Sequence, residues 1–181
     1  MIVERVRTPI ELAELPELVA AGYSAAFPSV VQGPACPDLT RRIAIAQLIA
    51  EHGRKDHNPA GPLWGLFNNN FGNQDAAAAD QLPTPEDSDV ALFRTVPECE
   101  GTACQRRVQH VRRAFDTAEE GLEAYWLRFD AAYPEALAGM RAGTVEAVVN
   151  GLAQRHYFTA SPAAYVALMH ALVHEAERKG W

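Results

Sequence analysis

The feature that most constrains the fold is a long, mainly apolar segment, residues 39–53, in which Glu51 is the one acid. Its apolar residues recur with the period of a helix. Asp38 precedes the segment as a favourable N-cap, and Gly53 is of a type that commonly ends a helix. The sequence therefore predicts a helix over these residues with an acid in its last turn.

Glu51 shares a helical face with Ile43, Gln47 and Ala50, so its carboxyl is expected to leave the helix beside apolar neighbours. A glutamate with an ordinary pKa of about 4.3 is mostly ionised at neutral pH, whereas desolvation raises the pKa and keeps the proton in place. A protonated carboxyl is what a glycosidase uses as its general acid. The alternative is a solvated surface residue, the usual role of a glutamate in the last turn of a helix.

The rest of the chain predicts a mainly α fold of the α+β class with one small β-hairpin lobe. A long loop over residues 54–89 follows the Glu51 helix, with a short Ala-rich helical turn at 74–81. Weak two-residue alternation at 90–95 and 107–115 favours a hairpin with a longer turn. Further helices are expected to begin at Thr8-Pro9, Thr117, Pro134, Thr144 and Ser161-Pro162.

Size and charge narrow the class of protein. The 181 residues suffice for one compact domain, residues 1–181, and no linker divides them. The net charge of -7 argues against a nucleic-acid partner, which needs a cationic surface. No run approaches the roughly 20 apolar residues that cross a bilayer, and the N-terminus lacks the apolar core of a signal peptide. We expect synthesis in the cytoplasm and no membrane insertion.

Cys99 and Cys104 bracket the expected hairpin turn at a spacing that a disulfide can close. Reduced thiols are an equal alternative, because paired cysteines in cytosolic proteins are more often reduced. A disulfide would indicate work in an oxidising place that the protein reached without a standard leader. Cys36 would then remain as a small buried apolar residue.

Several short motifs follow one another along the chain in a fixed order. They are Ala46-Gln47-Leu48-Ile49-Ala50-Glu51-His52-Gly53, Asn69-Asn70-Phe71-Gly72, Glu98-Cys99-Glu100-Gly101 with Arg112-Arg113-Ala114-Phe115, and His156-Tyr157-Phe158-Thr159-Ala160 with Tyr165. In this order they resemble the bacterial and phage glucosaminidase-domain family of lysozyme-like peptidoglycan hydrolases. The resemblance covers residues 38–175 and leaves 1–37 as an N-terminal helix and connector. Ala160, Phe115 and Asn73 depart from the family pattern.

The resemblance implies a lysozyme-like helical domain in which Glu51 is the catalytic acid. It nominates Glu98 as the base that activates water, with Glu100 as the nearby substitute, and Tyr157 as a cleft residue that hydrogen-bonds the N-acetyl group or the reactive water. Glycosidic cleavage needs a proton donor and stabilisation of an oxocarbenium-like transition state, by a second carboxylate or by the acetamido group of the substrate. Alternatively, both hairpin acids are solvated turn residues and Tyr157 is a core aromatic with its hydroxyl satisfied.

The loop after the Glu51 helix supplies the other candidates for substrate binding. Trp64, Phe67 and Phe71 suit stacking on sugar rings, and Asn70 suits recognition of amides and hydroxyls. Packing and turn formation are the alternatives for these residues. Glu100 of the hairpin completes the expected substrate-binding set.

The resemblance implies a hydrolase that cuts the glycan strand of bacterial peptidoglycan at a β-1,4 bond beside N-acetylglucosamine. A lytic transglycosylase and a non-catalytic glycan-binding module are the alternatives. We expect no cofactor and no metal ion, because His52 and His57 belong to no zinc-binding pattern. Besides the glycan strand, a cognate inhibitor (immunity) protein is an expected partner. Delivery to the cell wall or periplasm by a secretion system, a phage particle or a lysis system would make the protein an antibacterial, bacteriolytic effector.

Overall fold

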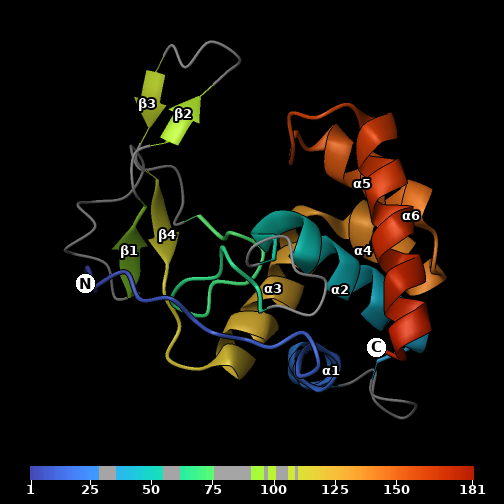
Figure 1. Cartoon of the computed structure of the whole chain (residues 1–181), viewed down its shortest axis with the longest axis horizontal. Coiled ribbons are helices and arrows are strands. Elements are labelled where there is room, and N and C mark those ends of the chain that lie inside the picture. Colours follow the sequence, from blue (N-terminus) through green and yellow to red (C-terminus); the bar gives the residue numbers. More distant parts are fainter. Residues whose placement is uncertain (29–35, 55–61, 76–90, 96–97, 101–105, 109) are drawn as a thin grey trace.

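The computed structural model describes residues 1–28, 36–54, 62–75, 91–95, 98–100, 106–108 and 110–181. For residues 98–100 and 106–108 it describes the backbone alone. The described part is mainly helical with a small antiparallel β lobe, as the sequence predicts (Figure 1). The helices are α1 (Leu15–Ala26), α2 (Asp38–His52), α3 (Ala118–Ala132), α4 (Pro134–Ala142), α5 (Val145–Gln154) and α6 (Pro162–Lys179).

Helix α2 lies in the middle of the molecule, with α4, α5 and α6 on one side and the β strands on the other (Figure 1). It packs against α1, α4 and α6. Nearly every residue from Ile43 to Ile49 is buried without solvent exposure, so α2 forms the centre of the apolar core. The last turn of α2 emerges from this core at Glu51.

Local sequence signals account for the helix ends. Thr117 and Glu120 form the expected capping box at the start of α3, with each side chain bonded to the backbone amide of the other residue. The Ser161 hydroxyl accepts a hydrogen bond from the amide of Ala164 and caps α6. Gly53 ends α2 with a positive φ of 63°, a conformation that glycine adopts without steric cost.

The β lobe is a long hairpin in two short ladders. Strand β1 (Leu92–Arg94) pairs with β4 (Val111–Arg113), and β2 (Glu98–Glu100) pairs with β3 (Arg106–Val108), both antiparallel. The hairpin is thus confirmed, although β2 occupies residues expected to be turn. Residue Ile2 adds a parallel bridge to β1 at Leu92, so the N-terminal segment runs along the lobe.

The start of the first helix was predicted wrongly. The sequence favours a helix from Thr8-Pro9, whereas α1 begins at Leu15, with Pro16 in its first turn. Proline suits that position because its missing amide hydrogen is not needed there. Thr8 is committed to the loop after α2 instead: its amide donates to Leu66 O at 3.1 Å, and its hydroxyl accepts from the amide of Asn69 at 2.9 Å.

Two smaller expectations also differ. Pro37 takes the N-cap position of α2, and Asp38 is the first helical residue, where it pairs with Arg41 at 3.0 Å. Gln74 and Asp75 are not helical, and the remainder of the expected turn at 76–81 lies outside the described residues. Among the helices that the structure describes, none is both long and apolar enough to span a bilayer.

Candidate active site

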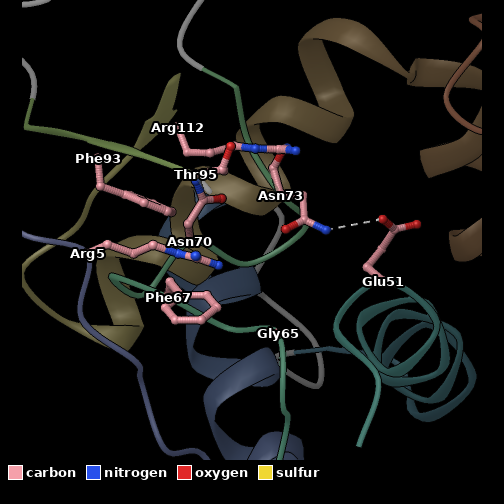
Figure 2. A pocket seen from close by; sticks show the side chains of 9 residues that line it. All are labelled: Arg5, Glu51, Gly65, Phe67, Asn70, Asn73, Phe93, Thr95 and Arg112. Carbon is pink, nitrogen blue, oxygen red and sulfur yellow. Dashed lines mark hydrogen bonds between the residues drawn. The ribbon is translucent and has the colours of Figure 1, made fainter. Parts of the chain in front are cut away.

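Glu51 projects from the last turn of α2 and is half-buried. The hydroxyl of Tyr165 in α6 donates a hydrogen bond to Glu51 Oε1 at 3.1 Å. From the other side, Asn73 Nδ2 lies 3.5 Å from Glu51 Oε2, at the outer limit of a hydrogen bond (Figure 2). The carboxyl is therefore held between a helix and the loop that follows α2.

Burial raises the pKa of the Glu51 carboxyl above its ordinary value, because removal from water penalises the charged form. The hydrogen bonds from Tyr165 and Asn73 and the positive charges of Arg112 and Arg128 lower the pKa and limit the rise. Burial outweighs these contributions. Glu51 thus keeps its proton to a higher pH than an exposed glutamate, which is what a general acid requires.

A chain of hydrogen bonds between uncharged groups lies beside Glu51. Tyr125 donates to Gln47 Oε1 at 3.1 Å, and Gln47 Nε2 donates to the hydroxyl of Tyr157 at 2.8 Å. The hydroxyl of Tyr157 reaches the carbonyl oxygen of Gly72 at 3.4 Å. Burial raises the pKa of Tyr157 far above its ordinary range, so its hydroxyl stays protonated. The arrangement connects α2 and the segment after α5 to the loop that carries Asn73.

His52 attaches the same loop to the end of α2. Its Nε2 accepts a hydrogen bond from the amide of Gly72 at 3.0 Å, and its Nδ1 lies 3.3 Å from the carbonyl oxygen of Gly65. These partners require a neutral ring with the proton on Nδ1. Burial is the main reason that the pKa of His52 falls to about 4, since a charged imidazole has no water around it there.

The loop itself is built from short polar contacts. Asn70 is buried and donates to the carbonyl oxygens of Gln74 and Arg113 at 2.8 and 2.7 Å, while its Oδ1 accepts from the amide of Gln74 at 2.6 Å. Gly72 has a φ of 72°, and a Cβ there would lie 2.9 Å from the Tyr125 ring. Only a residue without a side chain fits at this point.

Two adjoining pockets meet at Glu51, and both are lined by Glu51, Asn73 and Arg112. The lobe-side pocket, of about 240 Å³, extends to Arg5 and Phe67 (Figure 2). The helix-side pocket, of about 300 Å³, is lined further by Asp75, Arg128, Tyr133, His156 and Tyr157. The acid therefore lies on the shared wall of a two-part groove.

Arg112 of β4 connects the β lobe to the site. Its guanidinium forms an ion pair with Asp75 Oδ1 at 3.2 Å and donates to the carbonyl oxygen of Asn73. Asp75 is the one carboxylate besides Glu51 that lines either pocket among the residues described. Because Arg112 already neutralises Asp75, Glu51 is the only carboxyl of the groove without a cationic partner in this part of the chain.

Some of the predicted site residues line the two pockets, and others do not. Tyr157 lines the helix-side pocket with Glu51, and Phe67 and Asn70 line the lobe-side pocket. Trp64 is 46% exposed and lines neither pocket; the guanidinium of Arg7 covers its ring at 3.7 Å.

Phe71 is fully buried in the apolar core. A ring without exposed surface has no face to offer a sugar, so we replace the stacking role expected for Phe71 by a packing role. Asn70 is likewise committed to loop contacts through both ends of its amide.

The side chains of the hairpin candidates lie outside the part of the chain that the structure describes. The backbone of Glu98, Cys99 and Glu100 forms β2, but their side chains are not described, and Cys104 is not described at all. The roles expected for Glu98 and Glu100 and the disulfide between Cys99 and Cys104 remain predictions. Cys36 is a buried free thiol.

Sequence reasoning missed several groups around the acid. Tyr165 entered only as the end of a motif, and Asn73 only as a departure from one, yet both contact Glu51. Arg128 and Arg5 carried no signal, because neither belongs to a motif and the contacts arise from the fold. The Arg112-Arg113 pair beside the hairpin was a usable signal of charge near the site.

Three of the described histidines, His52, His170 and His174, contact groups other than metals. Both ring nitrogens of His52 face backbone groups, His170 Nε2 lies 2.7 Å from Glu146, and His174 lies 3.6 Å from Glu177. No group of metal-ligating side chains occurs in this part of the chain.

Comparison with known proteins gives neighbours in fold alone. No family model matches the sequence, and no curated protein matches it. The C-terminally truncated glycoside hydrolase domain of FlgJ from Salmonella typhimurium shares 16% identity at a TM-score of 0.49, over 90% of this chain and 97% of that one. Two mutant forms of a peptidoglycan hydrolase from Sphingomonas sp. A1 share 18% and 20% identity at TM-scores of 0.47 and 0.46. Each covers 87% of this chain, and the shares of their own chains are 89% and 92%.

Proposed function

We propose that this protein is a glycoside hydrolase that cuts the glycan strand of bacterial peptidoglycan at a β-1,4 bond beside N-acetylglucosamine, with Glu51 as general acid. The observation that carries the proposal is the half-buried carboxyl of Glu51 with a raised pKa on the shared wall of two pockets. A bond lying across that wall would place one sugar in each pocket and the glycosidic oxygen beside the acid.

The contacts of Glu51 suit both halves of a proton transfer. Before the transfer, burial keeps the carboxyl protonated. After the proton has moved to the leaving oxygen, the carboxylate is stabilised by the hydrogen bonds from Tyr165 and Asn73 and by the charges of Arg112 and Arg128. Groups that favour the charged form are therefore ready at the moment it appears.

Stabilisation of the oxocarbenium-like transition state needs a second group. Glu98 is the base that the sequence resemblance nominates, and it would have to approach the groove from the β lobe. Asp75 is a second candidate, because it lines the helix-side pocket with Glu51. Its carboxylate is already paired with Arg112 at 3.2 Å, so that pair would have to open before Asp75 could bind a water molecule through the same oxygen.

The test is digestion of purified peptidoglycan, with products identified by mass spectrometry. Hydrolysis gives reducing ends at N-acetylglucosamine, and Glu51→Gln should abolish it. Glu98→Gln and Asp75→Asn then show which carboxylate assists, because loss of the assisting base lowers kcat by about 100-fold or more. A Glu51→Gln variant that digests walls as well as the parent would end the proposal.

A lytic transglycosylase is the second candidate. The pairing of Asp75 with Arg112 leaves Glu51 as the one unpaired carboxyl of the groove within the described residues, and a transglycosylase needs only one, as acid and then as base. Its products end in 1,6-anhydromuramic acid, so the same mass spectra separate the two reactions. A non-catalytic glycan-binding module would bind strands and release neither product.

A further inference from the structure

We propose that Arg128 makes the helix-side pocket a binding site for a carboxylate carried by the muramic-acid side of the substrate. The inference rests on the proposed function, because it assigns to that groove a preference among amino-sugar polymers. It concerns the side of Glu51 on which α3 ends, where Arg128 and Tyr133 line the pocket.

The charges of the pocket do not cancel. Its described cations are Arg112 and Arg128, and its described anions are Glu51 and Asp75. Asp75 is paired with Arg112 at 3.2 Å, and the raised pKa of Glu51 favours its neutral form before reaction. Arg128 thus keeps an uncompensated positive charge in the resting site, although the whole chain has a net charge of -7.

Arg128 also has a hydrogen-bonding group to spare. Its Nη2 donates a long bond of 3.4 Å to the hydroxyl of Tyr133, and its guanidinium lies 5.7 Å from the centre of that ring. Its Nη1 is buried from solvent and has no hydrogen-bond partner among the residues that the structure describes. A buried donor without an acceptor is costly, and an arginine is always charged, so an anionic acceptor is the group that would satisfy it.

A carboxylate fits these requirements better than a neutral sugar. It can accept two parallel bonds from one guanidinium, and it supplies the missing negative charge. Sugar hydroxyls and acetamido groups can accept a bond but bring no charge. In a strand of alternating amino sugars, carboxylates occur on the muramic-acid units: on the stem peptide, or on the lactyl ether where the peptide has been removed. Both sources offer the same chemistry to Arg128.

The experiment measures binding by calorimetry in the Glu51→Gln background, so that no substrate is consumed. The probes are peptide-bearing glycan strands, strands stripped of peptide by an amidase, and neutral chitopentaose. Arg128→Gln should weaken binding of at least one carboxylate-bearing probe by about tenfold to a hundredfold and that of chitopentaose by less than about twofold. Loss confined to stripped strands assigns the lactyl carboxylate, and loss confined to peptide-bearing strands assigns the stem.

Arg141→Gln is the matched control. Arg141 likewise bonds a tyrosine hydroxyl, that of Tyr23 at 3.2 Å, and lies 4.5 Å from the centre of the Phe27 ring, but it lines neither pocket of the groove. Its substitution should leave all three affinities unchanged. Arg128→Lys keeps the charge without the planar fork and should fall between the parent and Arg128→Gln.

Equal losses on charged and neutral probes, or no loss on any, would overturn the role of Arg128 and leave the proposed function intact if the parent still cuts walls. Failure of the Glu51→Gln protein to bind any of the three probes would overturn both. Thermal melts of each variant establish that it is folded. A further sign of the proposed contact is that rising salt weakens binding of the charged probes more in the parent than in Arg128→Gln.

Discussion

The two sides of the groove present different chemistry to the same carboxyl. On the helical side, Glu51 meets Tyr165, which is buried and neutral, with Gln47 and Tyr157 close behind. On the side of the β lobe, the groove is bordered by Arg112, Arg5 and the partly exposed Asn73. Neutral buried groups carry no charge that salt can screen, whereas the partly buried charges of Arg112 and Arg5 do. The buried neutral groups are therefore suited to set the protonation of the acid, and the charged groups that line the two pockets to select the ligand.

The largest expected effect comes from removing the acid itself. Glu51→Gln should lower turnover by about 100-fold to 10,000-fold, the usual contribution of a general acid. The same substitution should raise the melting temperature at neutral pH. A raised folded-state pKa means that ionised Glu51 costs stability above its folded pKa, so the gain should disappear as the pH falls below the ordinary glutamate value. Thermal melts from pH 3 to 8 measure this gain in stability. A Glu51→Gln variant less stable than the parent at pH 7 would contradict the conclusion that burial against the helical side raises the pKa of Glu51.

His52 offers a test that concerns stability alone. Its folded pKa of about 4 lies below the ordinary 6.5, so the unfolded chain binds its proton first. The contribution of neutral His52 to the free energy of unfolding is fully present above pH 6.5 and is lost as the pH falls to 4. The total loss is about 3 kcal/mol. Denaturant unfolding should show a shallower pH slope in this window for His52→Gln than for the parent.

A smaller effect separates the two sides directly. Tyr165→Phe removes the largest of the contributions that lower the Glu51 pKa, so the high-pH limb of activity should move to higher pH, with a rate loss of about threefold to tenfold. Arg112→Gln should move the limb in the same direction by less. Only the difference between parent and Arg112→Gln should shrink in high salt. Equal salt dependence in both variants would contradict the distinction between the sides.

The smallest effects distinguish the two loop aromatics. Phe67 lines the lobe-side pocket together with Arg5, whose guanidinium lies 3.7 Å from the centre of the ring, and Phe67→Ala should raise KM severalfold, since an aromatic contact is worth about 1 kcal/mol. Trp64 is exposed, lines neither pocket and lies beneath Arg7, so Trp64→Ala should leave kcat and KM within about twofold. The reverse result would move the sugar-binding surface from the pocket to the outer face of the loop.

The sequence predicted those structural features that depend on residues close together in the chain. The last turn of α2 and the start of α3 at Thr117 arise from neighbours within a few residues, and sequence patterns reveal such causes. The contact of Tyr165 with Glu51 joins residues 114 positions apart, and no periodicity records it. The delayed start of α1 has the same origin, because Thr8 is held by the loop at Leu66 and Asn69 rather than by its own helix.

The main chain of Gly72 is held on both sides: its amide donates to His52, and its carbonyl oxygen accepts from Tyr157. Whatever follows it is thereby delivered to the acid by the main chain, independently of its own side chain. Asn73 occupies that place with a φ of 50°, a conformation that only glycine, asparagine and aspartate readily adopt. Few residue types can therefore replace Asn73 to change the pKa of Glu51. Aspartate would add a negative charge beside Glu51, and glycine would leave a gap for water.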